Sequence, residues 1–372
     1  MSILLFTLLK PLHGVQADDM QISALRGAMR ASYPFTILLA AGCCVTAGST
    51  KSPSDGIVDT KGVMPVPCHS HNGYMQDEPL IGAVQLGCTS VEADVRLKDK
   101  ELYVAHEKKD IKKDITLKKL YIDVLVKNLD DRNPKNKQKK SKKPKERNKK
   151  NQPNQPTIKQ SGLHGLFDEN PAQTLMLLID LKSKGDTWKY VNKHIGPLRD
   201  RGYLTYLDGD KLISCPITVV ITGKPLLKKV LENKFQDIFF DAELAGMGEG
   251  KQKECNWSNS FLASTNFGTA VGNFTTINDF TEKHLEQMEQ DIKAARSRGI
   301  KVRYWNTPVD PDELRLHIRT VLSDKVDYVN EDIFIKEAAF FLKGKDKPDT
   351  RYKWAHRQLP GRLWGTSARD GH

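Results

Sequence analysis

Eight short apolar runs, separated by helical patterns, constrain the fold of this chain more than any other feature. The runs cover residues 63–68, 89–97, 175–182, 217–223, 237–244, 260–265, 300–307 and 326–332. Helical periodicity lies between most neighbouring runs, for example in PLIGAVQLG after the first run and DFTEKHLEQMEQDIKAARSRG before the seventh. Nearly all-apolar strands that alternate with helices form a parallel sheet covered on both faces. Eight such units predict a closed (β/α)8 barrel, the TIM-barrel class of α/β folds.

A further run, ELYVAH at residues 101–106, follows the second predicted strand too closely to allow a helical crossover. Parallel strands need such a crossover, whereas antiparallel strands are joined by short turns. We therefore expect this run to extend the second strand as a hairpin.

The N-terminal residues contain two candidate targeting segments. SILLFTLL is short and has no basic residue before it, whereas the stretch that begins at Met29 carries Arg30, an apolar run and small residues up to Ala47. We expect residues 1–47 to be a targeting region, with a signal peptide that starts at Met29 as the better candidate. Neither run reaches the roughly 20 apolar residues of a membrane span. Export through the secretory pathway is therefore expected, with mitochondrial delivery as the alternative.

The net charge of +12 is concentrated in one segment. Between Arg132 and Lys150 there are eleven Lys or Arg residues and one acidic residue, Glu146, so this segment carries about +10 of the total. Residues 130–162 hold too few apolar side chains to offset the entropy of ordering, and we expect a disordered insertion there. Such a segment is either solvated or attracted to an anionic membrane surface. It has no aromatic residues for base stacking, so no nucleic-acid partner is expected.

Four cysteines lie beyond the targeting region, namely Cys68, Cys88, Cys215 and Cys255. Their spacing matches neither a structural zinc site nor the dense disulfide framework of a small secreted domain. Cys68 and Cys88 each adjoin a predicted strand. The default interpretation is a pair of buried free thiols, and the alternative is a bridge between neighbouring strands of an exported protein.

Acidic side chains gather near the C-terminal ends of the second and third predicted strands, where barrels of this class carry their chemistry. Glu92 and Asp94 are two residues apart and leave the same face of one strand, and Asp180 lies on the next. Burial of like charges this close together is costly without a counter-ion. Three hard oxygen ligands favour one divalent ion, Mg²⁺ or Ca²⁺. The alternative is a salt-bridge network with Lys182 and Arg96.

Two histidines, His69 and His71, follow the first strand in PVPCHSHNGY, residues 65–74. An HxH pair at this place also binds zinc in amidohydrolase-like barrels, but such a centre needs further histidines at later strand ends. The fifth and sixth strands end in Asp, Glu, Ser and Thr. The preferred interpretation is one catalytic histidine with a neighbour that orients it, and a zinc hydrolase is the less favoured alternative.

The order of these motifs resembles a known group of enzymes. A His after the first strand, Glu-x-Asp on the second, a His that closes the hairpin and Asp-x-Lys on the third together resemble the phospholipase-C-like phosphodiesterase superfamily, which includes glycerophosphodiester phosphodiesterases and sphingomyelinase D enzymes. The stretches HSHNGYMQDEPLIGAVQLGCTSVEADVRLKDKELYVAH, LMLLIDLKSKGDTW, IFFDAEL and KVRYWNTP look closer still to the fungal altered inheritance of mitochondria protein 6 family. The resemblance covers about residues 62–342, which we take as the barrel domain, and leaves residues 343–372 as a C-terminal tail.

The resemblance implies a metal-dependent phosphoric diester hydrolase. The residues to which it gives roles are the acid/base pair His69 and His106, the metal ligands Glu92, Asp94 and Asp180, and Lys182, which would contact a phosphate oxygen. Asn72, after the first strand, and Trp305, at the end of the seventh, are further candidates for substrate contact. For Trp305, packing at the barrel mouth is the default interpretation, and a wall for the substrate is the functional one. The expected substrate is a glycerophosphodiester or a phospholipid, and a barrel that binds phosphorylated ligands without turnover is the alternative.

Overall fold

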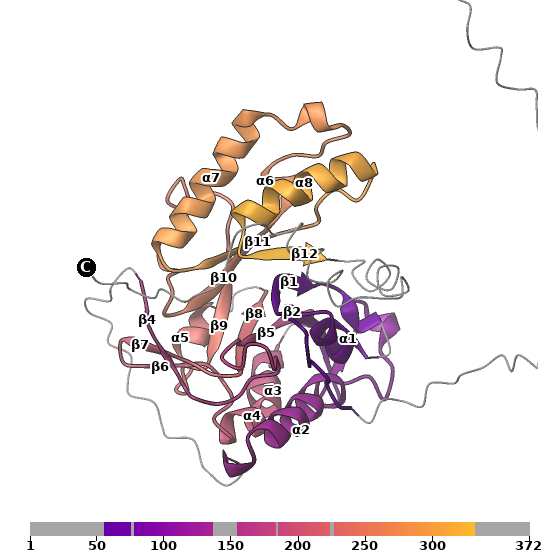
Figure 1. The fold of residues 1–372 in the computed structure, drawn as a ribbon, viewed down its shortest axis with the longest axis vertical. Coiled ribbons are helices and arrows are strands. Elements are labelled where there is room, and N and C mark those ends of the chain that lie inside the picture. Colours follow the sequence, from indigo (N-terminus) through magenta and orange to yellow (C-terminus); the bar gives the residue numbers. More distant parts are fainter. Residues whose placement is uncertain (1–55, 76–77, 137–154, 184, 224–226, 332–372) are drawn as a thin grey trace, which may run out of the picture. The chain divides into compact units, whose positions relative to one another are not determined.

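The computed structural model describes residues 56–75, 78–136, 155–183, 185–223 and 227–331 (Figure 1). The targeting region 1–47 and the tail 343–372 lie outside the described residues, so those two predictions stay predictions. No helix within the described ranges is both long enough and apolar enough to span a lipid bilayer.

Eight parallel strands close into a barrel, which confirms the predicted (β/α)8 fold. They are β1 (Val66–Ser70), β2 (Cys88–Lys98), β5 (Leu175–Leu181), β8 (Ile217–Thr222), β9 (Ile238–Glu243), β10 (Ser260–Asn266), β11 (Lys301–Trp305) and β12 (Tyr328–Glu331). The order is β1-β12-β11-β10-β9-β8-β5-β2, and β1 also pairs with β2, so the sheet has no open edge. The predicted hairpin is also confirmed, because β3 (Glu101–Val104) pairs antiparallel with β2.

Helices cover the outer face of the barrel in two groups (Figure 1). The α-helices are α1 (Pro79–Gln85), α2 (Asp123–Arg132), α3 (Thr187–His194), α4 (Gly196–Asp200), α5 (Leu227–Leu231), α6 (Phe267–Ala270), α7 (Glu282–Ser297) and α8 (Asp312–Lys325). The short 3-10 helices are η1 (Gly73–Met75), η2 (Lys108–Asp110), η4 (Pro134–Asn136) and η5 (Ile277–Asp279), and η3 (Lys118–Ile122) is a π-helix. Side chains of α1 to α4 share one apolar cluster with the outer faces of β2, β5 and β8, while α7 and α8 pack in a second cluster with β10 and β11.

Three of the helices differ from what the sequence pattern indicates. The stretch DTWKYVNKHIGPLRDRG has a helical pattern throughout but forms the two helices α3 and α4, because Pro197 lies in the first turn of α4 and has no N–H to continue the hydrogen bonding of α3. The helix α2 was not predicted, although Leu125 and Leu129, four residues apart, are both fully buried on one face.

The predicted disordered insertion, residues 130–162, is wrong at both of its ends. The helix α2 continues to Arg132, and β4 (Thr157–Gln160) pairs with β7 (Lys211–Ser214), which also pairs with β6 (Tyr206–Asp208) in a separate sheet of three strands. The backbone of β4 is satisfied by that pairing even though its four side chains are exposed, so low hydrophobicity did not prevent a strand there. Residues 137–154 lie outside the described residues, and disorder there stays a prediction.

The barrel interior is apolar near the N-terminal ends of the strands and polar near the C-terminal ends. On β5, Met176 and Leu178 belong to a buried cluster that also contains Leu207 of β6 and Leu212 of β7. Alternate residues of a strand share a face, so Asp180 lies on the same side as these two apolar residues and farther toward the C-terminal end. The small sheet thus packs against the apolar end of the barrel interior, and the candidate site occupies the other end.

Candidate active site and metal centre

The three predicted acidic ligands come together at the C-terminal end of β2 and β5. Asp94 is the register partner of Asp180, and Glu92 lies two residues before Asp94 on the same face. One carboxylate oxygen of each residue lies within 4.8 Å of one from each of the other two. The sequence prediction that these side chains converge is confirmed.

Burial raises the pKa of Asp94 to about 6, and the nearby charge of Glu92 adds to the effect. Its Oδ2 accepts a hydrogen bond of 2.8 Å from the Tyr74 hydroxyl, whereas its Oδ1 is buried and has no hydrogen-bond partner among the described residues. An orphaned buried carboxylate oxygen is costly. This oxygen beside two further carboxylates therefore fits a hard divalent cation such as Mg²⁺ or Ca²⁺.

Lys182 is the cation that the structure places beside these carboxylates. Its Nζ lies 2.6 Å from Asp180 Oδ2 and 3.5 Å from Asp94 Oδ2. Burial lowers the pKa of Lys182, but the hydrogen bond and charge of Asp180 outweigh it and raise the pKa. The alternative ion-pair network is thus present in part. Arg96 does not join it, because its Nε and Nη1 donate to the backbone carbonyls of His106 and Lys182.

His69 and His71 both face Glu92 Oε2, with Nε2 distances of 3.3 Å and 3.4 Å. His69 is fully buried, and its Nδ1 lies 2.6 Å from Ser90 Oγ. Burial, together with the charge of Arg303, lowers the pKa of His69 to about 3, so its ring is neutral at pH 7. Burial also raises the pKa of Glu92, but the hydrogen bond with His69 and the charge of His71 outweigh it and lower the pKa to about 2. Among the described residues, the group that could hold a metal contains neither histidine, so the geometry does not favour an HxH zinc site.

The other predicted site residues lie around this centre with different degrees of contact. The side chain of His106 is 55% exposed, and its Nδ1 lies 3.1 Å from Glu107 Oε1 rather than against the carboxylate cluster. Asn72 Oδ1 lies within hydrogen-bond distance, 2.8 Å, of the same Tyr74 hydroxyl that contacts Asp94. Trp305 is half-buried and ends β11.

Two charged residues inside the barrel, Asp241 and Arg303, were not predicted as part of a site. Asp241 is 6% exposed and accepts a hydrogen bond of 2.5 Å from Ser264 Oγ, and its Oδ1 has no hydrogen-bond partner among the described residues. Arg303 is 3% exposed and donates to Asn330 Oδ1 over 3.2 Å. Burial raises the pKa of Asp241 to about 7, against the charge of Arg303. A charged residue within an otherwise apolar strand was the signal used for Glu92, and it applies equally to Asp241 and Arg303.

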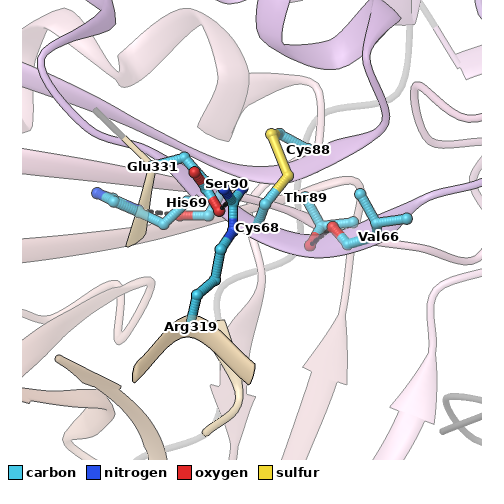
Figure 2. The surroundings of a disulfide bond; sticks show 8 residues. All are labelled: Val66, Cys68, His69, Cys88, Thr89, Ser90, Arg319 and Glu331. Carbon is cyan, nitrogen blue, oxygen red and sulfur yellow. Dashed lines mark hydrogen bonds and ion pairs between the residues drawn. A yellow bond between two sulfur atoms is a disulfide. The ribbon is translucent and has the colours of Figure 1, made fainter. Parts of the chain in front are cut away.

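The default interpretation of Cys68 and Cys88 as free thiols is wrong, and the alternative is confirmed. The two residues form a disulfide between β1 and β2, with their Cα atoms 4.9 Å apart (Figure 2). Cys215 and Cys255 are free and buried. The bridge depends on the parallel pairing of β1 with β2, the next barrel strand along the chain, rather than on cysteine spacing.

The chain is similar to a known domain family and to curated fungal proteins. Residues 58–241 match the AIM6-like phosphodiesterase domain. An altered inheritance of mitochondria protein 6 homolog from Arthroderma benhamiae is 34% identical over 287 residues, which are 73% of this chain and 83% of the relative. Altered inheritance of mitochondria protein 6 from Lachancea thermotolerans is 30% identical over 322 residues, which are 77% of this chain and 69% of the relative. No solved structure matches significantly.

The stretch that matches the family model, residues 58–241, holds the acidic cluster, His69 and the barrel strands from β1 to β8. The extent and identity of the match agree with the resemblance of the ordered motifs. The chain therefore belongs to the altered inheritance of mitochondria protein 6 family and carries its phosphodiesterase-type barrel domain.

Proposed function

We propose that this protein hydrolyses a phosphodiester with the help of one divalent ion, Mg²⁺ or Ca²⁺, bound by Glu92, Asp94 and Asp180. The observation that carries the proposal is the convergence of these three carboxylates, and one of them, Asp94, has a buried Oδ1 without a hydrogen-bond partner among the described residues. Lys182 balances one of the three negative charges. The remaining charge favours a cation there, and a bound divalent ion would supply positive charge against the phosphoryl oxygens.

Lys182 is proposed to contact a phosphate oxygen. Its ammonium group already lies between Asp180 and Asp94, at the polar end of the barrel interior. Negative charge on the equatorial oxygens of phosphorus grows during in-line displacement, so a fixed ammonium group there stabilises the transition state more than the ground state. Asn72 and Trp305, at the ends of β1 and β11, are proposed to contact the alcohol part of the substrate.

Proton transfer is proposed to involve His69, with His106 as the second group that the family resemblance implies. The role of His69 is supported by its contact with Glu92 Oε2 at 3.3 Å, which joins it to the acidic cluster. His106 would have to turn from Glu107 toward the cluster. A specific observation favours His71 as an alternative second group, because its Nε2 is 3.4 Å from Glu92 Oε2 and its side chain is 20% exposed.

The substrate class is proposed to be a glycerophosphodiester or a phospholipid. The Lys-rich segment between Arg132 and Lys150 is proposed to attract an anionic membrane surface, which would bring the barrel mouth to a lipid substrate. Passage through the secretory pathway is supported by the Cys68–Cys88 bridge, since disulfides persist in oxidising compartments. The names of the relatives, which refer to mitochondrial inheritance, support the mitochondrial alternative.

A ³¹P NMR screen tests the proposal. Purified protein with Mg²⁺ or Ca²⁺ is incubated with glycerophosphodiesters, lysophospholipids and phospholipids, and we expect one class to give a new monoester or cyclic phosphate signal. Glu92→Gln, which keeps the size of the side chain but removes its charge, is the matched inactive control. Absence of turnover for every diester, in a protein that still binds the divalent ion, would replace hydrolysis by phosphate-ligand binding without turnover.

A further inference from the structure

The disulfide lies directly beside the residues that hold His69. Cys68 precedes His69 on β1, and Cys88 lies two residues before Ser90 on β2 (Figure 2). His69 and Ser90 are register partners, and their side chains are joined through Nδ1 and Oγ at 2.6 Å. Both sulfur atoms are buried with their residues, since Cys68 is 4% and Cys88 0% exposed.

The pairing of β1 with β2 is irregular at the level of the bridge. Val66 pairs with Cys88 and His69 pairs with Ser90, so β1 advances three residues while β2 advances two. Such a bulge leaves an extra residue unpaired and disrupts the ladder locally. At this level the two strands are also joined by a side-chain hydrogen bond, in which Thr89 Oγ1 donates to the Val66 carbonyl over 3.0 Å, and by the disulfide.

The bulge decides which way His69 points. Successive side chains of a strand alternate between its two faces, so a slip of one residue between β1 and β2 would turn His69 from the barrel interior to the helix-covered face. In the observed register, the His69 ring lies between Ser90 Oγ and Glu92 Oε2. The covalent link between Cys68 and Cys88 lies at the point where the pairing of β1 with β2 is irregular, and it ties the two strands together there.

We propose that Cys68 and Cys88 are positioning residues of the active site, whose bridge holds His69 against Ser90 and Glu92. Reduction by a dithiol breaks the S–S bond, gives each sulfur one proton and one electron, and converts the dithiol to its own disulfide. The register at the bulge is then free to shift, and the ring of His69 leaves its two partners. The site is therefore complete only after oxidation. The kinetic consequence rests on the proposed function, whereas the position of the His69 ring does not.

The test compares the oxidised and reduced forms of the same protein. Wild type is refolded with and without dithiothreitol, and free thiols are counted to verify the state of the bridge. We expect reduction to lower kcat at least tenfold with little change in KM, at a temperature well below the thermal transition. The double variant Cys68→Ala/Cys88→Ala should show the same low kcat and no response to dithiothreitol. The matched control Cys215→Ala/Cys255→Ala, which removes the two free buried cysteines, should respond as wild type does.

A second readout is independent of turnover. In protein labelled with ¹⁵N-histidine, the ring signals of His69, assigned with His69→Asn, should shift on reduction, and Ser90→Ala should shift them in the oxidised protein. Unchanged ring signals and unchanged kcat in fully reduced, folded protein would overturn the inference and leave the proposed function standing. If no diester is turned over, the ring signals alone decide, with a shift supporting the positioning role and no shift refuting it.

Discussion

Replacement of Asp241 by Asn is expected to stabilise the protein at neutral pH. Asp241 is buried inside the barrel, and burial raises its pKa to about 7 from 3.8, against the attraction of Arg303. When the pKa of an acid is raised in the folded state, the folded protein becomes less stable as pH rises, because the acid ionises at lower pH in the unfolded chain. Asn resembles the protonated carboxyl in shape, can still accept from Ser264 Oγ, and does not ionise.

The magnitude follows from the two pKa values. One pKa unit corresponds to about 1.4 kcal/mol, so the wild-type carboxylate costs up to roughly 4 kcal/mol of stability at pH 7. At pH 4, close to the unfolded pKa, the cost is only about 0.5 kcal/mol. The advantage of Asp241→Asn over wild type should therefore grow by about 3 kcal/mol between pH 4 and pH 7. Any fixed effect of the new amide cancels in this difference.

The assay is urea unfolding in excess chelator at several pH values from 4 to 8. Asp237→Asn is the matched control, because Asp237 lies just before the same strand and is also buried, but it is paired with Arg199 at 2.5 Å. Loss of a charge that pairs a buried partner destabilises by roughly 3–5 kcal/mol. Opposite signs for the two variants at pH 7 are expected. An effect of Asp241→Asn on the free energy of unfolding that is the same at pH 4 and pH 7 would refute the reasoning. It would show that the pKa of Asp241 is not raised in the folded protein.

The remaining predictions concern the histidines, the Lys-rich segment and the bridge. His69→Asn should lower kcat by roughly 10²–10⁴-fold. Whichever of His71→Asn and His106→Asn lowers kcat by a comparable factor identifies the second proton-transfer group. The double variant of that residue with His69→Asn should have a kcat barely lower than that of either single variant. Equal, small losses in all three would contradict acid/base catalysis by histidine. An uncharged Gly/Ser linker of equal length in place of residues 137–154 should leave the thermal transition within about 2 °C and abolish salt-dependent binding to anionic vesicles; unfolding would show that these residues are structural. Cys68→Ala/Cys88→Ala, which opens a loop with a sequence separation of 20, should cost about 3 kcal/mol of unfolding free energy in urea titrations, and no loss would show that the bridge does not constrain the unfolded chain.

The barrel was predictable because its strands carry a strong local signal. Buried parallel strands are largely apolar on both faces, and most of the eight runs follow this pattern, with charged residues such as Glu92, Asp94 and Arg303 as exceptions. The small sheet was not predictable, because the side chains of β4 are exposed and only its pairing with β7, 54 residues later at Thr157 and Lys211, defines it as a strand. Low hydrophobicity over residues 130–162 therefore suggested disorder where the chain contributes an edge strand.

The acidic cluster was predictable for a geometric reason, and the placement of His106 was not. Glu92 and Asp94 share a face because their spacing is two, and the parallel pairing of β2 with β5, the next barrel strand along the chain, brings Asp180 beside them. His106 follows the hairpin, where its ring direction depends on tertiary contacts such as the donation from Arg96 Nε to its backbone carbonyl.

The dependence of turnover on free Mg²⁺ or Ca²⁺ tests the central claim most directly. Chelator-treated wild type and Asp180→Asn are titrated with each ion while phosphodiester hydrolysis is followed by ³¹P NMR, and binding of the same ion is measured by calorimetry. We expect no turnover in excess chelator, recovery in wild type over the same concentration range as calorimetric binding of one ion per chain, and neither binding nor turnover in Asp180→Asn. Full turnover in excess chelator, or an unchanged titration in Asp180→Asn, would contradict a phosphodiesterase whose metal is held by Glu92, Asp94 and Asp180.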